Sequence, residues 1–224
     1  MWASLVPLII ASAILPMQII VTIVLRRSRA GLHAAAAFVA GMTLLRLVQG
    51  FVLAVVIGSA QAASDQVDSG GGPVLSTVLL VAGVVLLAAA LRQWLTGEDP
   101  DAPPPRWLAV AESMKPHTAF GFGMLLVALG GKWWVFTLGA VAAITDAGQS
   151  VALSVVDYLV FVALAELPVL LIVVSSAIAP RRSEPVLEAI SRWMDRNNHR
   201  IVIAACVFFG VWFVLKALAN FGVV

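Results

Sequence analysis

Residues 117–145 read HTAFGFGMLLVALGGKWWVFTLGAVAAIT. This stretch is long enough to cross a bilayer, whose hydrocarbon core needs about 20 predominantly apolar residues. Gly130, Gly131 and Lys132 interrupt it near its centre. A lysine at the centre of a lipid-facing helix costs about 2.5–3.5 kcal/mol, so it is expected to face protein or water. The stretch therefore predicts a membrane-spanning helix that is broken at its middle.

The composition of the whole chain agrees with a membrane protein. Its 224 residues are 61% hydrophobic and 12% charged, with a mean hydropathy of +1.01. Soluble domains average about 45–50% apolar and about 25% charged residues, and one of this size could not bury so much apolar surface. The composition excludes an ordinary cytosolic enzyme and a disordered tail. Cys206 is the single cysteine, which excludes a disulfide framework within the chain.

Five further apolar runs predict five more spans, at residues 2–25, 30–59, 74–91, 151–179 and 201–221. We therefore expect an all-α integral membrane protein with six transmembrane helices, and no enzymatic activity, because little of the chain remains for a soluble catalytic domain. A turn-rich, proline-rich cytoplasmic linker with an interfacial helix, residues 96–116, separates residues 1–95 from residues 117–224. Each of these two parts would hold three helices.

Basic residues are distributed unevenly around the six runs. The turn after the first run, the linker and the segment before the sixth run contain eleven of them, whereas the other two loops contain none. The eleven are Arg26, Arg27, Arg29, Arg92, Arg106, Lys115, Arg181, Arg182, Arg192, Arg196 and Arg200. Because cytoplasmic loops carry an excess of Lys and Arg, we expect a multi-pass protein of the bacterial cytoplasmic (inner) membrane with both termini extracytoplasmic.

With this orientation the first helix starts outside and the fourth starts inside, so the two three-helix repeats would be inverted. Transporters of this architecture bind substrate near the midplane, and paired interruptions in corresponding helices indicate the site. Pro16 and Gln18 interrupt the first span, and Gly130 and Gly131 interrupt the fourth. Pro168 predicts a further break in the fifth span, because proline cannot donate a helical hydrogen bond.

Two cytoplasmic stretches, residues 106–116 and 183–198, carry apolar residues at helical spacing opposite charged ones. Short basic helices lying on the membrane surface are the simplest interpretation. A gate or a contact with anionic lipid is the alternative.

Three ionisable residues, Arg46, Lys132 and Glu166, fall near the centres of their spans. Intramembrane charges generally mark functional sites, although a static buried salt bridge is the structural alternative. Two cations and one acid favour an anionic head group such as phosphate, sulfate or carboxylate. Trp133 and Trp134, beside Lys132, would form either an apolar wall of a substrate cavity or part of the core.

We expect no metal and no cofactor, because the three histidines are far apart in sequence and Gly131-Lys132 lacks the spacing of a P-loop. We also expect no nucleic-acid partner, because the net charge is only +2 despite a pI near 9.1.

Several short motifs, in order, resemble the lysine-exporter (LysE) superfamily and more closely its actinobacterial GAP branch, the glycolipid- or sulfolipid-addressing proteins. Leu129-Gly130-Gly131-Lys132 stands where the family has Leu-Asn-Pro-Lys, so a helix break is kept but the asparagine amide is lost. The other motifs are Leu15-Pro16, the basic turn at residues 26–32, Gly41, residues 140–150, Leu167-Pro168, Trp193, Arg196-Asn197-Asn198, Ile201 and Gly210.

The resemblance implies a six-span exporter, often a homodimer, that moves cell-envelope lipids or glycolipids outward. Gln18, Arg46, Lys132, Trp133, Trp134 and Glu166 are the predicted substrate-binding residues. One alternative is a proton-coupled exporter of amino acids or small ions, in which Asp157 and Glu166 carry the proton. Another is a non-transporting scaffold for envelope-lipid biosynthesis or export proteins.

Overall fold

The computed structural model describes residues 2–64, 72–96, 110–111 and 113–221, and within these ranges the regular secondary structure is α-helical. Most of the predicted 96–116 linker and interfacial helix lies outside the described residues. The helices are α1 (Trp2–Ala13), α2 (Pro16–Arg27), α3 (Gly31–Ser64), α4 (Gly72–Thr96), α6 (Pro116–Leu129), α7 (Gly131–Thr145), α8 (Val151–Ala165), α9 (Leu167–Ile178) and α10 (Pro180–Asn220).

Two continuous stretches, Gly31–Ser59 of α3 and His199–Ala219 of α10, are long and apolar enough to cross a membrane. Three bent pairs would each supply one more span: α1 with α2, α6 with α7, and α8 with α9. The bends are 45°, 70° and 62°. The described apolar part of α4, Gly83–Thr96, is shorter than a span. The membrane-embedded all-α class is thus confirmed, whereas six spans in two inverted repeats stay a prediction.

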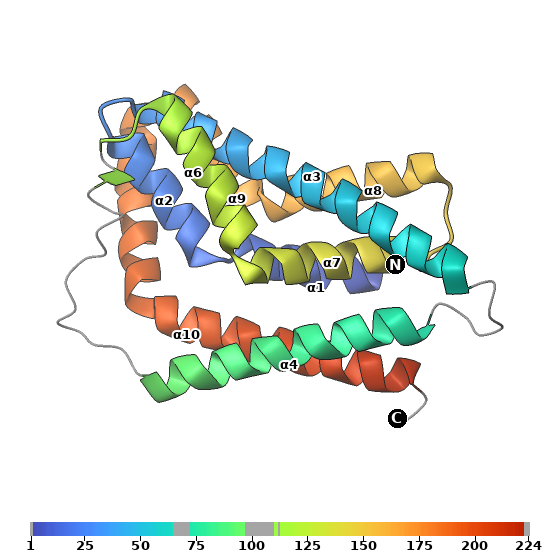
Figure 1. Ribbon diagram of the computed structural model, residues 1–224. Helices are drawn as coiled ribbons and strands as arrows, with labels where there is room; N and C mark the ends of the chain where they lie inside the picture. The colour runs from blue at the N-terminus through green and yellow to red at the C-terminus, as the bar shows by residue number, and fades with distance from the viewer. Residues whose placement is uncertain (1, 65–71, 97–109, 112, 222–224) are drawn as a thin grey trace.

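Helix α3 lies at the centre of the bundle and contacts α2, α6, α7, α8 and α9. Figure 1 shows α4 side by side with the second part of α10, forming a helix pair next to this bundle. The pair is close because Gly83 and Gly210 face each other, and a Cβ atom on either would overlap atoms of the other helix. Small residues of this kind let helix backbones approach in a membrane, where van der Waals packing drives association.

The helix ends lie at two opposite ends of the bundle (Figure 1). The start of α1, the turn from α7 to α8 and the end of α10 lie at one end. The turn from α2 to α3, the start of α6 and the end of α9 lie at the other end.

The predicted surface helix at residues 183–198 is not a separate element. It is the first part of the 41-residue helix α10, which bends before its apolar second part (Figure 1). Leu187 and Met194 are buried, and Glu188 pairs with Arg27 of α2 at 2.7 Å. The remaining apolar side chains, Val186, Ile190 and Trp193, are exposed. Residues 183–198 are thus helical as predicted, but they continue into the following span after a change of direction, and half of their apolar face packs inside the protein. A position on the membrane surface stays a prediction.

A buried polar site where three helix breaks meet

The break between α1 and α2 follows from Pro16. Proline has no N–H, so the carbonyl of Ser12 loses its partner four residues ahead. The side chain of Gln18 replaces it, because Nε2 donates a hydrogen bond to the Ser12 carbonyl at 2.9 Å. Gln18 is fully buried, and its backbone carbonyl accepts a hydrogen bond from Thr22 Oγ1 at 2.6 Å. The Gln18 side chain therefore supplies the hydrogen bond to the Ser12 carbonyl that Pro16 cannot donate.

The break between α6 and α7 centres on Gly130, whose backbone is extended. A Cβ atom here would overlap the Trp133 ring and lie 2.7 Å from the Leu126 carbonyl, so the position requires glycine. Two side chains donate hydrogen bonds to backbone carbonyls in the last turn of α6, next to the break. Gln49 Nε2 donates to Val127 at 3.3 Å, and Trp134 Nε1 donates to Ala128 at 2.8 Å.

The break between α8 and α9 places Glu166 at the junction, where it ends one helix and precedes the next. Pro168 occupies the first turn of α9, where a missing N–H costs no helical hydrogen bond. The Glu166 side chain is 1% exposed and accepts a hydrogen bond from Thr43 Oγ1 of α3. The break thus delivers a carboxyl group to the interior of the bundle.

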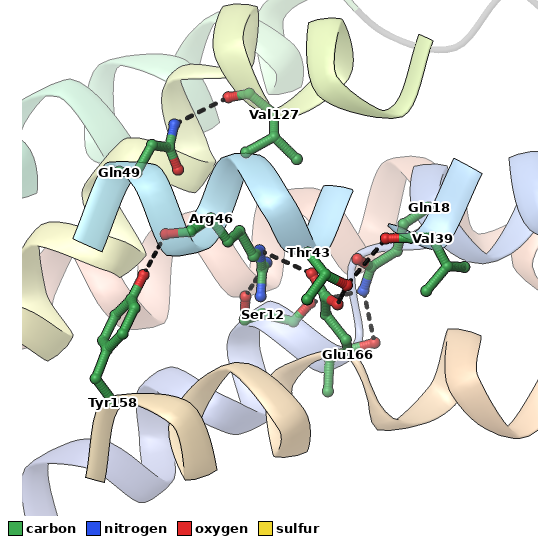
Figure 2. Close-up of polar contacts among 10 residues, drawn as sticks. Ser12, Gln18, Val39, Thr43, Arg46, Gln49, Val127, Tyr158 and Glu166 are labelled. Atoms are coloured by element: carbon green, nitrogen blue, oxygen red, sulfur yellow. Dashed lines mark hydrogen bonds and ion pairs between the residues drawn. The ribbon is translucent and has the colours of Figure 1, made fainter. Parts of the chain in front are cut away.

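All three breaks contribute to the surroundings of Arg46, on the unbroken helix α3, and Figure 2 shows Ser12 and Glu166 from two of them beside it. Its Nη2 donates to Ser12 Oγ at 2.6 Å, and its Nε lies 3.6 Å from Glu166 Oε1. The Cζ atom lies 4.4 Å from the centre of the Trp133 ring, a cation–π distance. Each broken span therefore contributes one side chain to the surroundings of Arg46, which is only 1% exposed.

The backbone carbonyl of Arg46 also forms a hydrogen bond with a neighbouring helix. Tyr158 of α8 donates a hydrogen bond from its hydroxyl to the Arg46 carbonyl at 2.6 Å (Figure 2). The tyrosine ring occupies space that a side chain at position 50 would need, since a Cβ on Gly50 would overlap it. Gly50 thus allows α8 to approach α3 one turn from the arginine.

Hydrogen-bonding capacity remains at this site. Arg46 Nε and Nη1 and Glu166 Oε1 are buried and have no hydrogen-bond partner among the described residues. A buried polar atom without a partner costs about 1–3 kcal/mol, so such atoms in a native protein call for an explanation. Nη1 lies on the edge of the guanidinium away from the Nε–H, so each of these nitrogens could donate to a separate oxygen of an anionic group.

The predicted site residues divide into two groups. Arg46, Glu166, Gln18 and Trp133 are brought together, with Pro16, Gly130, Gly131 and Pro168 at or next to the breaks. Trp134 is 38% exposed and turns away from Arg46. Asp157 is partly exposed on α8, and the side chain of Lys132 lies outside the described part of the chain. Among the described residues, no cluster of three His, Cys, Asp or Glu could hold a metal ion.

Sequence reasoning missed Ser12, Thr43, Gln49 and Tyr158. The signal for two of them is present in the spacing, because Thr43, Arg46 and Gln49 recur every three residues and share a face of α3. Ser12 and Tyr158 carry no comparable signal, since their roles depend on how α1 and α8 pack against α3.

The fold and the site define an α-helical, membrane-embedded protein whose broken helices enclose a buried arginine–glutamate pair. A family model described as Sap, sulfolipid-1-addressing protein, matches residues 5–219, and the chain belongs to this family. The resemblance to sulfolipid-addressing proteins is thereby confirmed, while the wider relation to the LysE superfamily stays a prediction. No curated protein and no solved structure shows significant similarity to the chain.

Proposed function

We propose that this protein is a transporter, not an enzyme, and that it moves or helps move an anionic, amphipathic lipid or glycolipid across the cytoplasmic membrane. The observation that carries the proposal is Arg46, a buried cation in a membrane-embedded bundle with two nitrogen atoms that lack hydrogen-bond partners. The description of its family names a sulfolipid, and a sulfate ester is an anion that guanidinium binds well.

The Arg46 site explains how the head group of such a lipid would be held at membrane depth. The anion would accept a hydrogen bond from Arg46 Nη1, which lacks a partner among the described residues, or would take the place of Glu166 Oε1, which lies 3.6 Å from Nε. Glu166 would keep its hydrogen bond from Thr43. We assign Lys132, at the start of α7 beside Trp133, as the second cation that balances the substrate charge.

The three breaks would allow the broken spans to change their angles during transport. Transporters commonly use discontinuous helices around a midplane site, and segments next to a break can change angle without unwinding a whole helix. The breaks of this chain all contact Arg46, so binding at Arg46 would bias the angles of three spans together. The unequal basic loops favour an extracytoplasmic position for the α7–α8 turn, so outward transport would run toward that end of the bundle.

A proton-coupled exporter of small anions or amino acids is the second candidate. Glu166 favours it, because a buried carboxyl with one oxygen lacking a hydrogen-bond partner is suited to carry a proton. This candidate keeps the same site but predicts transport of water-soluble substrates driven by a pH gradient.

The test is transport by purified protein in liposomes that contain a fluorescent sulfated glycolipid, read out by its accessibility to an external quencher. Charge-assisted hydrogen bonds contribute about 1.5–3 kcal/mol, so Arg46→Gln should slow transport by about tenfold to a hundredfold. Lys216→Gln removes another cation from a span, away from the breaks, and should transport at the wild-type rate. A wild-type rate for Arg46→Gln refutes the proposal, and export of amino acids without lipid movement favours the second candidate.

A further inference from the structure

A cavity of about 560 Å³ lies between α3, α7 and α8. Its volume falls within the range of about 300–1,000 Å³ that small-molecule sites occupy. Aliphatic and aromatic side chains from all three helices line it, among them Phe51, Val55, Ile144, Val155 and Leu159. None of its described lining residues is charged, so the part of a ligand that enters it must be uncharged.

Polar groups are concentrated at one end of this cavity. Thr145, Gln149 and Ser154 lie at the turn from α7 to α8 or within the first turn or so of α8. From Val151 to Leu159 the lining extends over about 12 Å of the α8 axis, at 1.5 Å per residue. The cavity is thus an apolar cleft, open along one side, with polar groups at one end, an arrangement that suits an amphiphile whose chain lies along α8.

Tyr158 links the lining of the cavity to the backbone of Arg46. Its ring contributes to the lining, while its hydroxyl donates to the Arg46 carbonyl at 2.6 Å. The ring also lies against Gly50, another lining residue, where a Cβ would overlap it. One side chain therefore both lines the apolar cavity and contacts the backbone of the residue that carries the buried cation.

We propose that this cavity binds one hydrocarbon chain of a membrane lipid from the extracytoplasmic leaflet. The head group would lie at the Gln149 end, and the chain would extend inward along α8 toward Tyr158 and Leu159. The assignment to that leaflet, and the role of the cavity as an exit site, rest on the proposed function; the binding of a hydrocarbon chain does not.

The experiment uses full-length protein in vesicles that contain phosphatidylglycerol with a photoreactive diazirine in one acyl chain. After illumination, mass spectrometry maps the labelled peptides. Val155→Trp fills the cavity, and Val156→Trp is its matched control. The two valines are neighbours on α8, both are 53% exposed, and of the two only Val155 lines the cavity. We expect Val155→Trp to lower labelling of the cavity by about tenfold, the factor that loss of contact with about two methylene groups produces.

Val156→Trp should label as the wild type does, and Ala54→Phe, which fills the cavity from α3, should repeat the loss if Val155→Trp does not fold. Labelling spread evenly over the exposed faces of α3 and α8, or left unchanged by both filling variants, overturns the proposal. Arg46→Gln should keep cavity labelling. Its transport rate therefore tests the proposed function alone, and the two ideas can fail separately.

Discussion

Replacing both members of the Arg46–Glu166 pair separates a structural salt bridge from a transport site. At 3.6 Å and an effective dielectric constant of about 20, the Coulomb attraction within the pair is about 5 kcal/mol. Removing one member of a buried pair typically costs about 3–5 kcal/mol, because the other charge stays buried without its partner. We therefore expect Arg46→Met and Glu166→Leu each to destabilise the protein by about 3–5 kcal/mol.

The double variant should behave differently. Apolar residues of similar volume often replace a buried ion pair at no cost, so its stability should lie within about 1 kcal/mol of the wild type. Stability is measured by equilibrium unfolding in mixed micelles, and transport is measured on the same preparations. We expect the double variant to be as stable as the wild type and inactive. A stable double variant that transports at the wild-type rate would refute the reasoning, because the pair would then only hold helices together.

Two further predictions concern the first break and the end of the bundle. Gln18→Leu leaves the Ser12 carbonyl buried without its partner and should cost about 1–3 kcal/mol in free energy of unfolding. Adding Pro16→Ala restores an N–H to that carbonyl, so thermal unfolding of the double variant in detergent should recover, and no recovery would contradict this account of the break. Partial burial raises the pKa of Asp146 above its ordinary value, and Lys216 opposes the rise. The folded protein then holds this proton more tightly than the unfolded chain does, so stability falls as pH rises from the ordinary carboxyl pKa through the raised one, and Asp146→Asn should flatten that decline in a pH series of melting curves.

The membrane class and the helix breaks were predictable because their causes are local. A run of apolar residues is insoluble in water whatever its neighbours are, and Pro16 lacks an N–H in any fold. The break at Gly130 was predictable from flexibility, but the need for glycine there became clear only from the contact with Trp133. Depth in the membrane made Glu166 a partner for either Arg46 or Lys132, since all three fall midway along their spans, and the structure shows the contact with Arg46.

The adjacent residues Trp133 and Trp134 show a feature that the sequence could not predict, which is the direction in which each side chain points. Trp133 stacks on Arg46, whereas Trp134 turns to the Ala128 carbonyl, although the sequence predicts the same alternatives for both, a cavity wall or part of the core. Neighbouring helical side chains point about 100° apart, so the rotation of α7 against α3 selects one of them. The first part of α10 gives the same result, since packing against α2 buries one half of its apolar face and leaves the other half exposed.

The sequence by itself determined three properties: the protein is embedded in a membrane, its spans break at particular residues, and a few charged residues fall near the centres of the spans. These properties follow from the chemistry of single residues and short runs. Only the tertiary structure decided that the three breaks meet at Arg46, that Tyr158 links this site to the lining of an apolar cavity, and that Arg46 Nε and Nη1 lack hydrogen-bond partners among the described residues. Those features depend on how helices distant in sequence rotate and approach one another, and that geometry is set by packing across the whole bundle.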